Sequence, residues 1–106
     1  MDYIQIFTTT ERRADADKLS RMLISKRLAA CVQVVGPTVS YYKWKGRNVK
    51  SKEWLCIIKT KKTAYKKVER ELKRMHPYEL PEIVATQFAA GSKEYFAWVS
   101  ERLRKT

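Results

Sequence analysis

The sequence predicts an α+β domain of the ferredoxin-like type, with the element order β-α-β-β-α-β and one more helix near the C-terminus. Three observations predict this fold class. The 106 residues fit one domain that spans residues 1–106. Apolar residues make up 44% of the chain, the usual share for a folded protein. Along the chain, segments with the alternating apolar pattern of strands are followed by segments whose apolar residues recur every three or four positions, as in helices.

The first two elements are expected to be a strand and an amphipathic helix. Residues 3–9 are β-rich, and apolar and polar side chains alternate there. Thr10 then offers an N-cap for a helix that should end near Leu28. The buried face of this helix is expected to contain Ala16, Leu19 and Leu23, and Arg27 continues the same helical spacing.

A long β-hairpin is expected next. Its first strand combines the apolar run 31–35 with residues 38–44, and it should be kinked at Gly36-Pro37 because proline cannot donate to a sheet ladder. Residues 45–48 are turn-like, and a second strand follows at residues 49–59. Such a hairpin outreaches a four-stranded sheet of average strands. The overhang should expose aromatic side chains that need a partner: Tyr41, Tyr42, Trp44 and Trp54.

The second half of the chain repeats the helix and strand and adds a helix. Thr60 or Thr63 is expected to cap a helix that stops before Pro77 and has one apolar face, formed by Tyr65, Val68, Leu72 and Met75. A strand is expected at residues 82–89. Ser92 should cap the last helix, whose packed face contains Tyr95, Trp98, Val99 and Arg102 or Leu103.

The charge of the chain favours anionic partners. Its 23 basic and 11 acidic residues give a net charge of +12, which suits nucleic acid, acidic lipid or phosphate-bearing ligands, although a solvated surface explains it equally. Basic and aromatic residues interleave near the hairpin tip, as on nucleic-acid surfaces. Residues 51–58 lack the pattern of an RNA-recognition motif, however, so nucleic acid is possible but not favoured. The many charges and the three glycines and three prolines are compatible with a thermostable protein.

The cysteine pattern favours a reducing compartment. Cys31 and Cys56 lie inside apolar runs and form no CxxC motif, so free thiols in the cytoplasm are the expectation. No apolar run approaches the roughly 18 residues that span a membrane. The N-terminus lacks the layout of a signal peptide. We therefore expect a cytoplasmic protein without a membrane partner.

Few residues can support chemistry. The chain lacks a phosphate-binding glycine loop, and its single histidine excludes a His-rich zinc site within one chain. That histidine, His76, follows a predicted helix, whose C-terminal end favours the protonated form. It is either a C-capping residue, or a metal ligand or acid-base group. The other candidates have an ordinary alternative as core, strand-end or interface residues: Cys31, Trp44, Glu53, Lys59 and Glu82.

Five motifs, in this order, make the chain resemble the CutA divalent-ion tolerance proteins. They are Arg27-Leu28-Ala29-Ala30-Cys31-Val32, Ser40-Tyr41-Tyr42-Lys43-Trp44-Lys45-Gly46, Glu53 with Lys59-Thr60, His76-Pro77-Tyr78-Glu79-Leu80-Pro81-Glu82, and Ala90-Gly91 with Tyr95 and Trp98. The resemblance implies a homotrimer of ferredoxin-like subunits whose hairpin strands pair between neighbours. As in the PII signalling proteins, ligands would bind in clefts between subunits. The implied cleft positions are Cys31, Trp44, Glu53, Lys59, His76, Tyr78 and Glu82.

The same resemblance implies a role in the response to divalent metals, and copper binding is attributed to some members of the family. Some members have a cysteine in the first strand and two histidines before Pro-Tyr, whereas this chain has Phe7 and Met75-His76. We therefore expect a homotrimer without an established enzymatic reaction. It would bind copper or another divalent metal at His76, or a small anionic ligand at Lys59. A stable basic trimer that binds nucleic acid or acidic partners is the alternative, and an enzyme that uses Cys31, Lys59 and His76 together is a third, less favoured interpretation.

Overall fold

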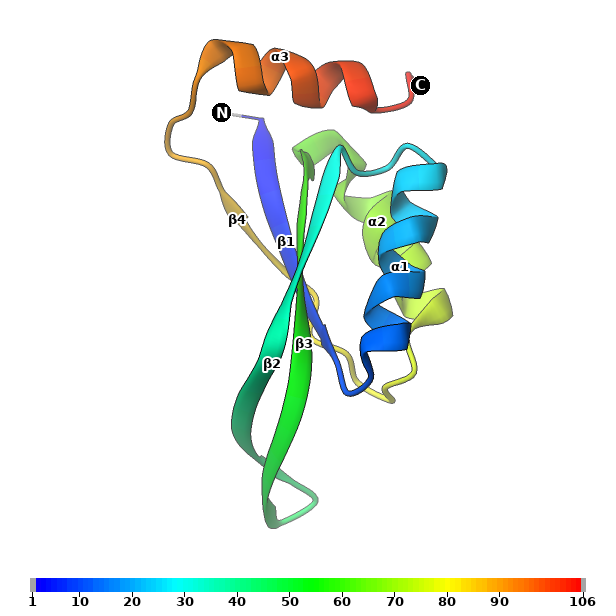
Figure 1. Ribbon diagram of the computed structural model, residues 1–106, viewed down its shortest axis with the longest axis vertical. Helices are drawn as coiled ribbons and strands as arrows, with labels where there is room; N and C mark the ends of the chain where they lie inside the picture. Colours follow the sequence, from blue (N-terminus) through cyan, green and yellow to red (C-terminus); the bar gives the residue numbers. More distant parts are fainter. Residues whose placement is uncertain (1, 106) are drawn as a thin grey trace.

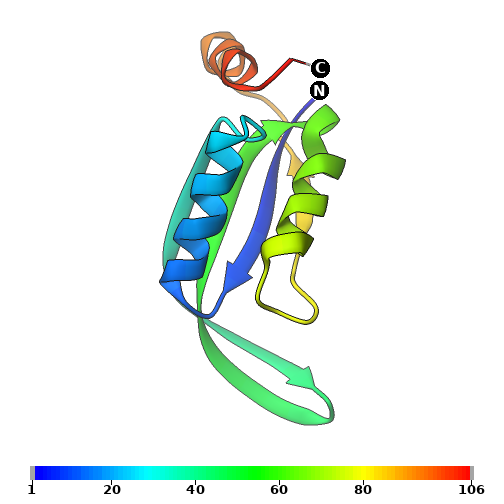
Figure 2. The same cartoon turned by 90° about the vertical axis from the view of Figure 1, so that its right-hand side faces the viewer.

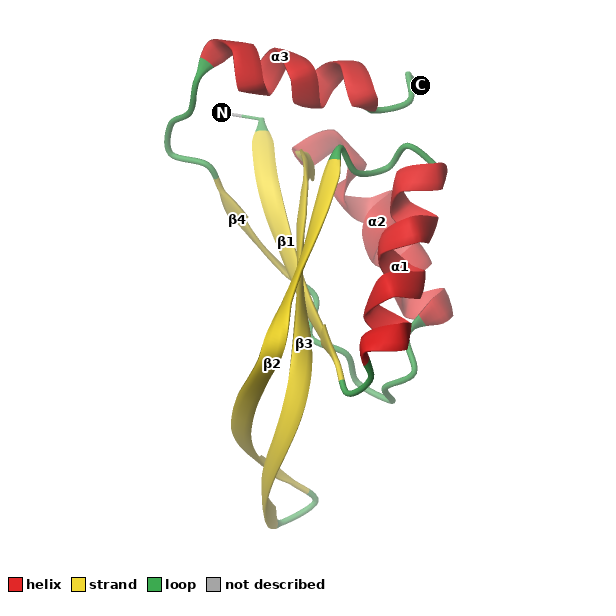
Figure 3. Ribbon diagram, viewed as in Figure 1, coloured by secondary structure: helices red, strands yellow, loops and turns green. Residues whose placement is uncertain are grey.

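The computed structural model describes residues 2–105 and confirms the α+β architecture with a four-stranded antiparallel sheet of order β2-β3-β1-β4 (Figure 1). Helices α1 and α2 lie side by side on one face of the sheet, and α3 crosses one end of the domain (Figures 2 and 3). The elements are β1 (Tyr3–Thr10), α1 (Arg13–Ser25), β2 (Cys31–Trp44), β3 (Arg47–Lys61), the short 3-10 helix η1 (Lys62–Ala64), α2 (Tyr65–Met75), β4 (Val84–Gln87) and α3 (Lys93–Arg102).

The main core lies between the sheet and the two paired helices. Every second residue of β1 is buried, as the alternation in its sequence predicts. The helix residues at the expected spacing are also buried: Ala16, Leu19 and Leu23 in α1, and Val68 and Leu72 in α2. A second, smaller cluster joins α3 to the sheet, and Val99 and Leu103 are buried in it as predicted.

The threonine caps expected from the sequence are wrong. Thr10 is the last residue of β1, and its hydroxyl donates to the carbonyl oxygen of Arg12 at 2.8 Å. Thr60 lies in β3, and its hydroxyl donates to the carbonyl oxygen of Leu28 at 2.7 Å. Both are fully buried, so their hydroxyls bond to nearby carbonyls. Thr63 lies within η1, and α2 begins without a side-chain cap.

The end of α1 and the bounds of β4 differ from the expectation, whereas the start of α3 agrees with it. Helix α1 ends at Ser25 because Arg27 adopts a left-handed φ of 57° and closes a Schellman motif. Strand β4 spans Val84–Gln87 instead of 82–89, since it pairs only with the β1 segment 4–7. The Ser92 cap is confirmed, with its hydroxyl accepting from the Tyr95 backbone N–H.

The hairpin leaves the sheet, as expected. β3 pairs with β1 only from Trp54 to Lys61, so residues 38–53 form a two-stranded ribbon beyond the sheet (Figure 1). The ribbon stretches the domain to 45 × 26 × 21 Å, and its radius of gyration is 14.4 Å, against about 13 Å for a compact chain of this length. Tyr41 on the ribbon is 73% exposed. A two-stranded ribbon is marginally stable in water, so this segment needs further contacts.

The kink between sheet and ribbon requires a glycine. The β2–β3 register shifts between Val35 and Thr38, which confirms the kink at Gly36-Pro37. A Cβ atom at Gly36 would lie 2.7 Å from the ring of Trp54. The indole therefore packs directly on the Gly36 backbone where the ribbon begins.

The close contact at Gly36 gives a stability prediction. Gly36→Ala should lower the free energy of unfolding by about 1–3 kcal/mol, because the added methyl overlaps the Trp54 ring. Urea denaturation followed by circular dichroism measures this loss. Gln33→Ala, on an exposed position of the same strand, is the matched control. A Gly36→Ala variant as stable as this control would contradict the packing.

Candidate functional site

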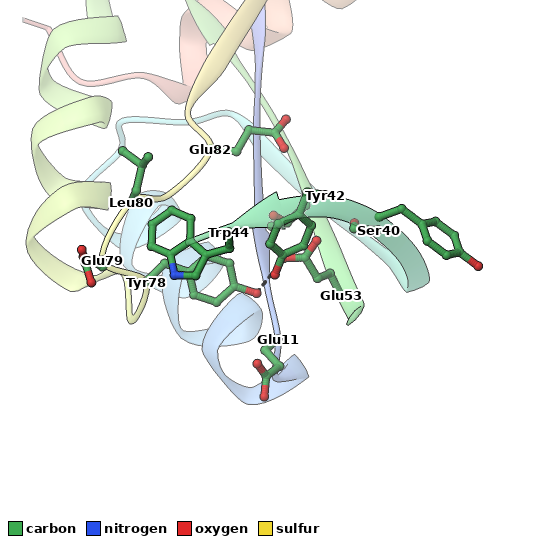
Figure 4. A pocket seen from close by; sticks show the side chains of 11 residues that line it. Glu11, Ser40, Tyr42, Trp44, Glu53, Tyr78, Glu79, Leu80 and Glu82 are labelled. Atoms are coloured by element: carbon green, nitrogen blue, oxygen red, sulfur yellow. Dashed lines mark hydrogen bonds between the residues drawn. The ribbon is translucent and has the colours of Figure 1, made fainter. Parts of the chain in front are cut away.

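A cavity of about 550 Å³ opens where the hairpin leaves the sheet (Figure 4). Its walls come from the end of β1, both hairpin strands and the segment between α2 and β4. Its lining residues include four carboxylates and four aromatic rings: Glu11, Glu53, Glu79, Glu82, Tyr41, Tyr42, Trp44 and Tyr78. No lysine or arginine of the described chain lines it. We call this cavity the acidic-aromatic pocket.

A hydrogen bond between Tyr78 and Glu53 crosses the wall of this pocket. The Tyr78 hydroxyl donates to Oε2 of Glu53 at 2.7 Å (Figure 4). Burial, and then the bond to Glu53, raises the pKa of Tyr78 well above its usual value. The phenol therefore stays protonated at neutral pH and keeps donating. Glu53 is only 5% exposed, so this bond supports a carboxylate that is largely removed from water.

His76 lies behind this wall and joins two segments that are far apart in the sequence. Its Nε2 lies 2.9 Å from the carbonyl oxygen of Thr9, and its Nδ1 accepts the backbone N–H of Tyr78 at 3.1 Å. A carbonyl can only accept, so Nε2 must carry the hydrogen, and Nδ1 must be unprotonated. The two bonds together select the neutral Nε2–H tautomer.

The environment of His76 opposes the protonated form that the helix end suggested. Burial lowers the pKa of His76 below its ordinary value, although the carbonyl of Thr9 and nearby carboxylates act in the opposite direction. His76 does end α2, as its backbone N–H bonds to the carbonyl of Leu72. Its side chain, however, bonds to β1 and to the following turn. Burial and these two bonds therefore outweigh the preference of a helix C-terminus for the protonated form.

The described residues of one subunit do not by themselves form a metal site. Both ring nitrogens of His76 are engaged, so a metal ion there would have to displace one of the two hydrogen bonds. Among residues 2–105, no group of three His, Cys, Asp or Glu side chains is arranged to hold a metal ion. The predicted metal ligand therefore has no free donor atom in the folded subunit.

The structure brings together only part of the predicted cleft. Trp44, Glu53, Tyr78 and Glu82 line the acidic-aromatic pocket. Cys31 and Lys59 are opposite each other in the β2–β3 ladder, six positions along β3 from Glu53, which corresponds to about 20 Å. The Lys59 ammonium lies over the Tyr95 ring, 5.9 Å from its centroid. In the part of the chain that the structure describes, Lys59 forms no ion pair with Glu53 or Glu82.

The two cysteines are free thiols in different environments. Cys31 is half-buried at the start of β2. Cys56 is buried in the core, and its burial raises the pKa of the thiol. The Cys56 side chain belongs to the packing under α1, and neither sulfur lines the acidic-aromatic pocket.

Two carboxylates of the pocket, Glu79 and Glu11, are not among the cleft positions predicted from the sequence. Glu79 follows Tyr78 in the turn, and this adjacency to a predicted cleft residue is the only feature of the sequence that indicates its position in the pocket. Glu11 follows β1 and precedes α1, where the sequence suggested only a solvated helix start. Its position in the pocket depends on where β1 ends relative to the hairpin, which local patterns do not encode.

Comparison with known proteins agrees with this architecture. The family model described as CutA1 divalent ion tolerance protein matches residues 4–102. The "Divalent-cation tolerance protein CutA" of Thermus thermophilus is 38% identical over 96 residues, covering 91% of this chain and 93% of the relative. The chloroplastic CutA of Arabidopsis thaliana is 31% identical over 95% of this chain, which spans only 56% of that relative. The crystal structure of CutA from Xylella fastidiosa superposes with a TM-score of 0.95 at 35% identity, covering 98% and 100% of the two chains.

The split β-α-β fold with an overlong hairpin, together with these matches over nearly the whole chain, defines the class of divalent-ion tolerance proteins. The chain belongs to the CutA family. No helix of the described residues is long and apolar enough to cross a membrane.

The Tyr78–Glu53 bond gives the first prediction for this site. Tyr78→Phe should lower the free energy of unfolding by about 1–3 kcal/mol, because it leaves a buried carboxylate without its donor. Chemical denaturation of Tyr78→Phe, Glu53→Gln and the double variant forms a cycle. The cycle should show strong non-additivity, and additive effects of the two substitutions would contradict the bond.

The pKa of His76 gives a pH prediction. Its folded value lies below the unfolded value of 6.5, so the unfolded chain binds more protons between the two values. The stabilisation from neutral His76 is therefore present above pH 6.5 and is lost as the pH falls below that value. The difference in Tm between wild type and His76→Gln should shrink from about pH 7.5 to about pH 5. Calorimetry at matched ionic strength checks this, and a constant difference would refute the shifted pKa.

Proposed function

We propose that this CutA-family protein works as a homotrimer in the response to divalent cations, and that the acidic-aromatic pocket is a weak cation site completed by a neighbouring subunit. The observation that supports this most strongly is the composition of the pocket. Four carboxylates line it without a basic residue, in a chain whose net charge is +12. A concave site with carboxylates concentrates cations locally, against the overall charge.

The hairpin supports the homotrimer. Its two-stranded part, residues 38–53, pairs with no third strand of the described residues. Its apolar and aromatic side chains are exposed: Val39, Tyr41, Tyr42 and Trp44. β2 is an edge strand, so its outer backbone groups need pairing or cover. The basic hairpin tip, with Lys43, Lys45 and Arg47, complements the acidic pocket of a second copy. These features favour pairing of hairpins between subunits.

The lining chemistry favours hard cations over copper. Carboxylate oxygens suit Mg²⁺, Ca²⁺ and Mn²⁺, whereas copper prefers imidazole or sulfur ligands. The aromatic rings add attraction for organic cations such as ammonium groups. Copper at His76 and a small anion at Lys59 stay predictions, and the hydrogen bonds of His76 make copper the weaker of the two metal hypotheses.

Assembly and cation binding can be measured separately. Light scattering should give three times the subunit mass of 12.5 kDa. Mn²⁺ titration followed by water-proton relaxation should show weak binding that Glu79→Gln/Glu82→Gln reduces by about fivefold or more, because two of the four carboxylates lose their charge. Glu94→Gln/Glu101→Gln, which removes the same charge from α3, is the control. Equal Mn²⁺ affinity in both double variants would contradict the pocket as the cation site.

Copper needs its own comparison. Cu²⁺ titration of wild type and His76→Ala tests the histidine directly. We expect similar affinities, since the ring nitrogens are already hydrogen bonded. Loss of most of the copper affinity in His76→Ala would restore His76 as the metal ligand and overturn the assignment to the carboxylates.

The basic hairpin offers a second candidate function, the binding of nucleic acid or acidic partners. Its cations already lie over its own rings, with Lys45 5.9 Å from the Trp44 centroid and Lys50 5.8 Å from the Tyr41 centroid. This geometry leaves fewer free ring faces for stacking bases. Retention on heparin that falls steeply with salt would favour this candidate, and no retention at low salt would exclude it. We also propose a cytoplasmic location, which the two free thiols favour.

A further inference from the structure

A second cavity, of about 440 Å³, lies at the end of the domain opposite the hairpin. Its lining residues come from the turn after α1, the end of β3 with η1, the first turn of α2, and the end of α3 with the segment that follows it. These elements lie at the end of the domain away from the hairpin tip (Figures 1 and 2). Five cationic side chains line it: Arg27, Lys61, Lys67, Arg104 and Lys105. No carboxylate of the described chain does. We call this cavity the basic cavity.

None of these five cations forms an ion pair with a side chain of the described residues. The ion pairs of residues 2–105 involve Arg13, Lys26, Arg74 and Arg102, none of which lines the basic cavity. Lys67, Arg104 and Lys105 therefore form no ion pair with an Asp or Glu side chain of residues 2–105. Cations that share a concave surface repel one another, and a bound anion would relieve that repulsion.

Arg27 has a different part in the cavity. Its Nε donates to the carbonyl oxygen of Arg102 at 3.1 Å, and its Nη2 donates to that of Glu101 at 3.0 Å. The backbone N–H of Arg104 bonds in turn to the carbonyl oxygen of Arg27 at 2.9 Å. These bonds hold the segment after α3 against the turn after α1. They therefore place Arg104 at the cavity, which Lys67 lines from the first turn of α2.

The remaining lining suits the oxygen atoms of an anion. Thr63 and Ser100 bring hydroxyl groups to the cavity. Neither η1 nor α2 has an acidic residue in its first turn or a side-chain cap at its start. The positive end of the α2 dipole therefore adds to the field of the lysines.

From this cavity we infer a further binding site, for a soluble anion that contains more than one phosphate group. Guanidinium and ammonium groups form strong charge-assisted hydrogen bonds to phosphate oxygens. The volume exceeds what a single phosphate fills, and cations on several walls suit a chain of linked phosphates. The site is independent of the acidic-aromatic pocket, because the two cavities share no residue.

Calorimetric titration with inorganic tripolyphosphate tests the site. Wild type should bind the probe, and Lys67→Gln/Arg104→Gln should weaken binding by about tenfold or more, because two charge-assisted bonds are lost. Lys66→Gln/Arg70→Gln removes the same charge from exposed positions of α2 outside the cavity and should change affinity by less than about twofold. Lys67→Arg/Arg104→Lys keeps the charge and should retain most of the binding.

The same titration separates possible sources of the phosphate chain. Equal affinity for tripolyphosphate and a nucleoside triphosphate would show that the phosphate chain alone is recognised. Tighter binding of the nucleotide would extend the site to the base or ribose. Absence of binding to both probes would overturn the inference, as would equal losses in the cavity variant and the α2 control, which indicate diffuse attraction to a basic surface. Mn²⁺ binding at the acidic-aromatic pocket should be unaffected in the cavity variant.

Discussion

The two hydrogen bonds of the His76 ring determine how the candidate site is built. One connects the ring to the carbonyl of Thr9 near the end of strand β1, and the other fixes the turn that follows α2. The second bond holds Tyr78, whose hydroxyl reaches Glu53 on β3 at the base of the hairpin. Three segments that are distant in sequence are thereby joined at the place where the hairpin leaves the sheet. This arrangement requires a neutral imidazole, which the buried position favours.

The charges of the chain are segregated despite its strongly basic balance. Carboxylates gather at the base of the hairpin, and cations that form no ion pair among residues 2–105 gather at the opposite end. A randomly mixed surface would solvate the chain equally well. The separation gives one small domain two concave surfaces of opposite sign, which suit ligands of opposite charge. The hairpin beside the acidic-aromatic pocket exposes apolar and aromatic side chains, so it is the surface most suited to contact another subunit.

Much of the fold could be predicted from the sequence, because alternation in β1 and helical spacing in α1 and α2 reflect burial directly. The role of the threonines could not be predicted, because tertiary packing decides whether a threonine hydroxyl bonds to a helix N–H or to a carbonyl oxygen. The site was predictable in part. Trp44, Glu53, Tyr78 and Glu82 do come together, whereas Cys31 and Lys59 lie elsewhere because ladder register sets their distance from the turn. The tautomer of His76 depends on a carbonyl 67 residues away.

The most direct test of this account is the tautomer of His76 in solution. Two-dimensional ¹H–¹⁵N NMR of the imidazole distinguishes the two neutral forms and the protonated one, and the chain has a single histidine, so assignment is unambiguous. The account predicts the neutral Nε2–H form at pH 7, with protonation only below the ordinary pKa of 6.5. A protonated ring, or an Nδ1–H tautomer, at pH 7 would contradict it, because neither can accept the N–H of Tyr78 at Nδ1.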